Sequence, residues 1–172
     1  MQRSSTSNSH ESGTTGNVFP IVFATDDNYA PYAGVAIRSI ISNADPRNTY
    51  RIFILYSSLS EEHIEALEGL STENVTVRCR YIVPSMSGVR SPLPELRYIS
   101  METYYRILIP EIEEFKAYPY VLYLDCDLIV NTDITGIVPQ SMGDNLIVGV
   151  RDNNMTIAVN RESVLKTDMK RA

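Results

Sequence analysis

The sequence predicts an α/β fold in which a mostly parallel, Rossmann-type sheet is flanked by helices. Short apolar runs rich in β-branched and aromatic residues alternate with segments of helical periodicity, which gives three strands separated by two helices. A further apolar run, residues 121–130, has the length and composition of a central strand covered on both faces. Because strand–helix–strand units in one sheet are nearly always right-handed, these elements specify a right-handed parallel sheet.

Size and charge exclude several classes of protein. The 172 residues are 44% hydrophobic and 21% charged, which is typical of one ordinary globular domain. The net charge of −6 argues against nucleic acid as the main partner. The two cysteines, Cys79 and Cys126, predict reduced thiols and no disulfide framework. With no apolar stretch near the roughly 20 residues of a membrane helix and no signal peptide, we expect a cytoplasmic protein without a transmembrane segment. Peripheral membrane association and self-association stay open.

The first strand and helix follow a polar segment. Residues 1–17 are rich in Ser, Thr, Asn and Gly and are predicted to be a disordered tail. A strand at residues 18–24 stops at the polar residues 25–28, where open α/β sheets bind their ligands. A helix with Pro31 in its first turn follows and ends at residues 43–46. Its predicted apolar face comprises Tyr32, Val35, Ala36 and Ile40, with Ile37, Ile41 and Ala44 alongside.

The next elements are a strand, a capped helix and an edge strand. The strand is predicted at residues 50–56, and Ser60 then caps a helix whose buried stripe is Ile64, Leu67 and Leu70. His63 lies off this stripe and is predicted to be a surface residue. Residues 75–83 alternate between apolar and polar side chains, which indicates an edge strand. Residues 84–97 are predicted to form an unusually long loop, and loops of this length tend to be functional.

Two more elements are predicted on either side of the run at residues 121–130. Ser100 can cap a helix at residues 101–109, whose core face includes Met101, Tyr104, Tyr105 and Leu108. Arg106 on this helix is a surface residue unless a carboxylate or phosphate lies within reach. A short buried strand is predicted at residues 146–150. The domain is thus expected to span residues 18–152, followed by an atypical C-terminal tail, residues 153–172.

Two acidic residues lie within the apolar run at residues 121–130. Asp125 and Asp127 are two positions apart, so in an extended chain their side chains leave one face while Cys126 turns to the other. Carboxylate oxygens at the carboxyl end of a strand suit Mn²⁺ or Mg²⁺ carrying a phosphorylated ligand. The alternative is that both acids are solvated turn residues, because an isolated D-x-D recurs by chance.

Three segments together resemble glycosyltransferase family 8, which contains lipopolysaccharide galactosyl- and glucosyltransferases and glycogenin-like enzymes. They are FATDDNY at residues 23–29, ISMETYYR at residues 99–106 and LYLDCD at residues 122–127, in the order and spacing of that family. The resemblance covers about residues 18–152, the nucleotide-sugar-binding part of the family's GT-A fold. It implies retaining transfer of a hexose from UDP-glucose or UDP-galactose to a saccharide acceptor, with Mn²⁺ or Mg²⁺ as the cofactor.

The same resemblance implies roles for individual residues. Asp26 would accept a hydrogen bond from the uracil ring N–H, and Tyr29 would lie against the base. The remaining donor-binding positions would be Ala24, Asn28, Ile99, Ser100, Arg106, Asp125 and Cys126. Asp125 and Asp127 would bind the metal, which bridges the diphosphate and stabilises the departing UDP. Asp152 resembles an acceptor-site carboxylate, with a helix cap or turn residue as the alternative.

The sequence departs from the family pattern beyond residue 152. It lacks the Asn-Ala-Gly-Val-like segment, the active-site amide and the late histidine that supplies a third metal ligand, since His10 and His63 both precede the D-x-D. We therefore expect a member truncated at its C-terminus, and a catalytically inactive nucleotide-sugar-binding remnant is the alternative to an active transferase. A third hypothesis is a haloacid-dehalogenase-like phosphatase, in which an apolar strand also ends in D-x-D, but the later Lys and acidic pair of that class are not found.

Overall fold

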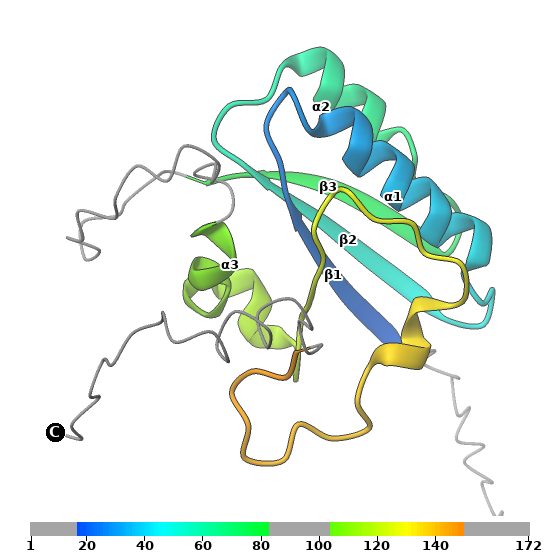
Figure 1. The fold of residues 1–172 in the computed structure, drawn as a ribbon, viewed down its shortest axis with the longest axis vertical. Helices are drawn as coiled ribbons and strands as arrows, with labels where there is room; N and C mark the ends of the chain where they lie inside the picture. The colour runs from blue at the N-terminus through cyan, green and yellow to red at the C-terminus, as the bar shows by residue number, and fades with distance from the viewer. Residues whose placement is uncertain (1–16, 83–103, 150–172) are drawn as a thin grey trace, which may run out of the picture. The chain divides into compact units, whose positions relative to one another are not determined.

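The computed structural model describes residues 17–82 and 104–149 of the chain (Figure 1). Its centre is a four-stranded sheet in the order β3-β2-β1-β4, and every pair of neighbouring strands is parallel. The strands are β1 (Val18–Ala24), β2 (Thr49–Tyr56), β3 (Val75–Tyr81) and β4 (Leu122–Tyr123). The predicted parallel α/β architecture is confirmed, and β3 is the edge strand that its alternating pattern indicates.

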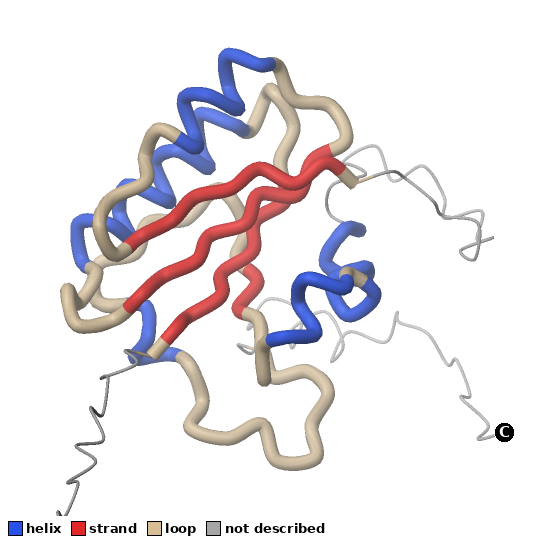
Figure 2. Tube along the Cα trace, turned by 180° about the vertical axis from the view of Figure 1, so that it is seen from behind, coloured by secondary structure: helices blue, strands red, loops and turns tan. Residues whose placement is uncertain are grey.

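Helices cover both faces of this sheet (Figures 1 and 2). Helices α1 (Ala30–Asn43) and α2 (Glu61–Glu68) run together along one face. Helix α3 (Tyr105–Leu108) and the 3-10 helices η2 (Ile109–Glu111) and η3 (Glu113–Ala117) lie on the other. A last 3-10 helix, η4 (Ile134–Ile137), follows β4. Among the described residues, no helix is both long and apolar enough to cross a membrane.

The alternation of side chains along the strands divides the core into two parts. Towards α1 and α2, the buried strand residues are Ile21, Phe23, Tyr50, Ile52, Ile54, Val75 and Val77. On the opposite face, the buried strand residues are Val22, Phe53 and Leu55. They pack against Tyr105 of α3 and Phe115 of η3, and the rings of Phe53 and Phe115 meet edge to face with centroids 5.1 Å apart. Both faces of the central strands are therefore buried, which explains their nearly continuous apolar sequences.

Helix α1 has its predicted bounds, but only part of its predicted apolar face is buried. Its buried residues are Ala30, Ala33, Ala36, Ile37 and Ile40. Tyr32 and Val35 are 57% and 56% exposed, so the prediction that they face the core is wrong. The buried stripe is centred on alanines, because small side chains let the helix backbone lie close to the sheet. In α2, Ser60 caps the helix as predicted, but only Leu67 of the predicted stripe is fully buried.

Three further segments differ from their predictions. The run at residues 121–130 pairs as a strand with β1 only at Leu122 and Tyr123. Leu124 and Cys126 each make one more hydrogen bond to β1, and Val130 bonds to α1. Residues 146–149 form no strand, and the side chain of Leu146 is 97% exposed, since a strand requires a partner to satisfy its backbone groups. The helix expected at residues 101–109 is α3 followed by η2, with Pro110 inside the 3-10 turn. Residues 101–103 and the loop at 84–97 lie outside the described residues.

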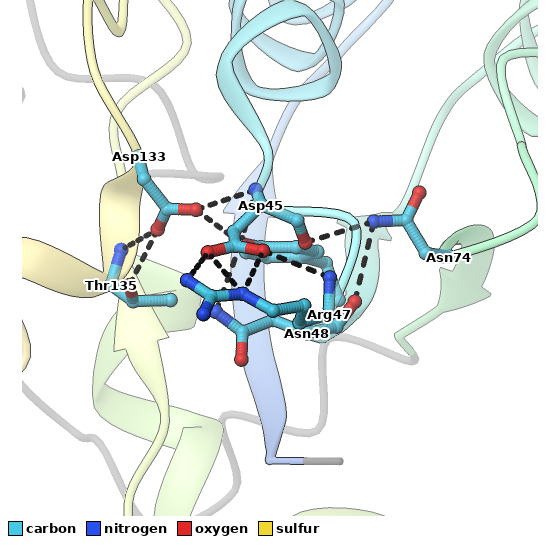
Figure 3. A network of polar contacts seen from close by, with 7 residues as sticks. Asp45, Arg47, Asn48, Asn74, Asp133 and Thr135 are labelled. Carbon is cyan, nitrogen blue, oxygen red and sulfur yellow. Dashed lines mark hydrogen bonds and ion pairs between the residues drawn. The ribbon is translucent and has the colours of Figure 1, made fainter.

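A network of hydrogen bonds at the amino end of the sheet joins the segment that follows β4 to the start of β2 and the residues before it (Figure 3). Asp133 Oδ2 accepts from the backbone N–H of Asp45 at 2.6 Å and from the hydroxyl of Tyr50. Its Oδ1 accepts from the N–H and hydroxyl of Thr135. Nearer to β4, the backbone N–H of Val130 donates to Ser39 Oγ of α1 at 2.9 Å. The chain from β4 to η4 is thus held at several points along α1, and this fixes the path of residues 124–130.

By its internal contacts the chain divides into two compact units, Met1–Val138 and Pro139–Ala172. All helices and strands named above belong to the first unit. The predicted disordered tail at residues 1–17, the predicted domain at 18–152 and the predicted C-terminal tail at 153–172 stay predictions, because residues 1–16 and 150–172 lie outside the described residues.

Candidate functional site

The polar turn after β1 leads from the sheet into α1. Its first residue, Thr25, is buried and donates its backbone N–H to the carbonyl of Leu55 in β2 at 3.0 Å. Asp26 then closes the turn: its Oδ1 accepts from the N–H of Tyr29 at 2.9 Å, and its carbonyl accepts from the N–H of Ala30 at 2.9 Å. Asn28 and Tyr29 are exposed. The turn therefore presents polar and aromatic groups at the carboxyl end of the sheet, on a hydrogen-bonded backbone.

The D-x-D residues lie beside this turn because the chain leaving β4 stays bonded to β1. The N–H of Leu124 donates to the carbonyl of Val22 at 2.9 Å, and the thiol of Cys126 donates to the carbonyl of Ala24 at 3.2 Å. Cys126 is buried, whereas Asp125 and Asp127 are exposed. The buried Cys126 between two exposed acids agrees with the alternation expected across this tripeptide, which lies just beyond the strand. That both carboxylates leave the same face stays a prediction.

Burial and three nearby negative charges act on the Cys126 thiol. Burial, together with the negative charges of Asp125, Asp127 and Asp26, raises the pKa of this thiol to about 11, although a hydrogen bond with Thr25 lowers it. The thiol is therefore protonated at neutral pH and serves as a buried donor, not as a nucleophile. Its hydrogen bond to the carbonyl of Ala24 shows that the β1 turn and the D-x-D converge on one region of the sheet edge.

A cation from α3 reaches the first acid of the D-x-D. The guanidinium of Arg106 lies 3.2 Å from Asp125 Oδ1 and 4.7 Å from the ring centroid of Tyr123. Partial burial of Tyr123 raises the pKa of its hydroxyl to about 12. The sequence left open whether a carboxylate lies within reach of Arg106, and the structure shows that Asp125, an exposed acid, does.

The described part of the chain offers two exposed carboxylates in this tripeptide but no larger set of ligands. Within residues 17–82 and 104–149, no group of three or more His, Cys, Asp or Glu side chains is arranged to hold a metal ion. Asp125 and Asp127 are hard oxygen donors, which Mn²⁺ and Mg²⁺ prefer, and ligands from a bound diphosphate and water can complete such a shell. The chemistry of the two acids therefore fits a divalent cation that arrives with a phosphorylated ligand.

Comparison with known proteins shows to which family the chain belongs. The sequence profile of the family described as Glycosyl transferase family 8 matches residues 20–171. The chain belongs to glycosyltransferase family 8. Among curated relatives, it is 24% identical to general stress protein A of Bacillus subtilis (strain 168) over 78% of this chain and 46% of that protein. It is 28% identical to a lipopolysaccharide 1,2-glucosyltransferase of Escherichia coli over 73% of this chain and 36% of that protein.

Solved structures extend this family relationship to the fold. The bifunctional glycosyltransferase WbbM matches with a TM-score of 0.66 and 28% identity, covering 83% of this chain and 24% of that chain. The galactosyltransferase LgtC, solved in complex with donor and acceptor sugar analogues, matches with a TM-score of 0.59 and 33% identity, covering 74% of this chain and 44% of that chain. The predicted GT-A-like architecture is confirmed by these matches. The family 8 chain described here spans less than half the length of each of these relatives.

The structure brings some predicted site residues together and leaves others out. Neighbouring segments at one sheet edge carry Ala24, Asp26, Asn28, Tyr29, Arg106, Asp125, Cys126 and Asp127. Ile99, Ser100 and Asp152 lie outside the described residues. Sequence reasoning missed a contact at this edge, in which His63 of α2 bonds to Asp27 of the β1 turn at 2.7 Å. The available signal was topological, since the carboxyl ends of the neighbouring strands β1 and β2 must lie side by side.

Proposed function

We propose that this family 8 chain binds a UDP-sugar together with a divalent cation, and that it transfers the hexose to a saccharide acceptor with retention of configuration. The observation that carries the proposal is the convergence of the β1 turn and the D-x-D, joined by the hydrogen bond from Cys126 to Ala24. A nucleotide-sugar donor requires two neighbouring sites. One binds the base and ribose, as the β1 turn could, and the other binds the diphosphate with its metal ion, as the two acids could.

The uridine would bind at the β1 turn. Asp26 keeps Oδ2 on the side away from its bond to Tyr29, with only a long 3.4 Å contact from Asn28, so this oxygen can accept from the ring N–H of uracil. Cytosine has no such donor at that ring position, so the carboxylate favours a uridine nucleotide. The exposed ring of Tyr29 offers a stacking surface, supported by Tyr32 at a centroid distance of 5.6 Å.

The diphosphate would bind between the D-x-D and Arg106. Asp125 and Asp127 would hold Mn²⁺ or Mg²⁺, and the bound ion would neutralise charge on the departing UDP. Asp125 and the ring of Tyr123 already orient Arg106, so its guanidinium would meet an anionic group with little further loss of rotamer freedom. These residues would bind and orient the donor. Asp152 stays a predicted contact to the acceptor.

Names of relatives support the substrate class. One relative is named a lipopolysaccharide 1,2-glucosyltransferase and a solved one a galactosyltransferase, so we propose UDP-glucose or UDP-galactose as donor and a saccharide of lipopolysaccharide synthesis as acceptor. A cytoplasmic site of action is part of the proposal, because Cys79 and Cys126 are both free thiols. Binding without turnover is the competing function, and it is favoured by the lack of a third metal-binding side chain among the described residues.

An assay of donor hydrolysis separates the two functions. The chain is incubated with UDP-glucose or UDP-galactose, with and without Mn²⁺, and released UDP is measured by mass spectrometry. Metal-dependent release of UDP above the rate in buffer supports a transferase, because without an acceptor water can take the acceptor's place and receive the hexose. Binding without release supports the inactive remnant, and neither binding nor release contradicts both.

A further inference from the structure

One carboxylate oxygen ties the β1 turn to the start of α2. Asp27 Oδ1 lies 2.8 Å from the backbone nitrogen of Ser60, 3.0 Å from Ser60 Oγ and 2.7 Å from His63 Nδ1. The partners are 33 and 36 positions away in the sequence. Asp27 therefore links two loops that β1 and β2 deliver to the same edge of the sheet.

The protonation of this cluster follows from its contacts. The backbone N–H of Ser60 and then the side chain of His63 lower the pKa of Asp27, so its carboxyl is ionised at neutral pH and can only accept hydrogen bonds. His63 Nδ1 must therefore carry a hydrogen, which assigns the donor role at this nitrogen. All three contacts are donations into one anionic oxygen, and hydrogen bonds to charged acceptors are the stronger kind.

The adjacent acids Asp26 and Asp27 fix the same turn in different ways. Asp26 bonds within the turn, to the N–H of Tyr29, whereas Asp27 bonds outward to α2. Helix α2 does not require Asp27 for its own cap, because Ser60 Oγ already accepts from the N–H of His63 and acidic residues occupy its first turn. The Asp27 contacts therefore act mainly on the turn, which has no other side-chain bond to α2 among the described residues.

We propose that Asp27, Ser60 and His63 form a positioning clamp for the nucleotide-binding turn, here called the Asp27 clamp. None of the three touches the donor; they hold the backbone from Asp26 to Ala30 in the conformation that presents Asp26 and Tyr29. The inference rests on the proposed function for the role of the turn, and on the three distances for the clamp itself. It gives His63, a surface residue by sequence pattern, a role in positioning the turn that binds the donor.

Two substitutions at one position test the clamp. His63→Ala removes the donor to Asp27, whereas His63→Asn keeps an amide N–H at a comparable reach. Hydrogen exchange is measured at the amides of Tyr29 and Ala30, which are both bonded within the turn. We expect faster exchange in His63→Ala and near-parent exchange in His63→Asn. Glu62→Ala, an exposed change in the same helical turn, is the matched control and should leave both amides unchanged.

The same variants are then titrated with UDP in the presence of Mn²⁺. The loss of a charged hydrogen bond should weaken UDP binding by about tenfold in His63→Ala, with recovery in His63→Asn. Parent-like exchange in His63→Ala overturns the clamp, and so does altered exchange with unaltered UDP affinity. A parent chain that fails to bind UDP counts against the proposed function instead, and the exchange comparison alone then decides whether the clamp exists.

Discussion

Arg106 and Asp125 form an ion pair across the candidate site, with 3.2 Å between the guanidinium and Oδ1. Arg106 comes from α3, on one face of the sheet, and Asp125 from the chain leaving β4. Both side chains are about half exposed, so the pair contributes little to folding stability. Its consequence is functional: a fixed cation lies next to an acid that we propose binds a metal, where a diphosphate would need both.

Substitution of Arg106 should separate charge from geometry. We expect Arg106→Ala to weaken UDP binding in Mn²⁺ by about tenfold or more, because a charged hydrogen bond is lost. Arg106→Lys should recover only part of the affinity, since a lysine keeps the charge but neither the planar fork nor the stacking on Tyr123. Isothermal titration with UDP measures both. Equal affinities in the parent and Arg106→Ala would remove Arg106 from the site.

The network around Asp133 should be a principal source of stability for the segment after β4. Asp133→Ala removes the acceptor of the Tyr50 hydroxyl and the nearer of the two acceptors of the Asp45 N–H, which should cost about 1–3 kcal/mol of unfolding free energy. Urea unfolding followed by circular dichroism checks this. Asp144→Ala, at an exposed position, is the matched control. A parent-like midpoint for Asp133→Ala would show that the segment is held by other contacts.

Acid should weaken the turn that contains Asp45. The side-chain and backbone hydrogen bonds from Arg47 lower the pKa of Asp45 from 3.8 to about 2. Because the folded-state pKa is depressed, the stabilisation is complete above pH 3.8 and is lost as the pH falls through about 2. Unfolding free energies of the parent and Arg47→Ala should therefore differ at pH 5 and converge near pH 2. A pH-independent difference would contradict this, and Arg38→Ala serves as the exposed control.

A buried hydroxyl without a partner predicts a stabilising substitution. In the described structure, Tyr105 is 1% exposed and its hydroxyl is buried without any hydrogen bond. Removing it in Tyr105→Phe should raise the unfolding free energy by about 1 kcal/mol, because an unsatisfied polar group no longer has to be buried. Tyr118→Phe is the matched control, since the hydroxyl of Tyr118 accepts from Arg51 at 3.0 Å and its loss should bring no gain. Thermal unfolding compares them, and a destabilised Tyr105→Phe would contradict the assignment.

The elements predicted well are those whose patterns are local. Continuous apolar runs predict strands β1 and β2. A proline in the first turn predicts the start of α1 and a serine cap predicts the start of α2, and both signals act within a few residues. The apolar run at residues 121–130 was predicted to be one strand, but an apolar residue can be buried outside a sheet. Val130 is buried beside α1, where its backbone bonds to Ser39 and Asn43. Only the tertiary structure shows this difference.

The same distinction applies to the candidate site. Asp26, Asp125 and Arg106 were predicted because each belongs to a motif that resembles a family pattern. The pairing of Asp27 with His63 joins two unremarkable residues from different loops, and no periodicity in either loop signals it. The exposure of Tyr32 was missed for a related reason, because an apolar side chain on a helix can face a neighbouring ring instead of the core.

Titration of UDP with and without Mn²⁺ tests the central claim most directly. The parent is compared with the double variant Asp125→Asn, Asp127→Asn, and with a charge-matched control, Glu111→Gln, Glu113→Gln, at exposed positions of η2 and η3. The account predicts Mn²⁺-dependent UDP binding in the parent and the control, and none in the double variant. Unaltered metal-dependent binding in the double variant would contradict it.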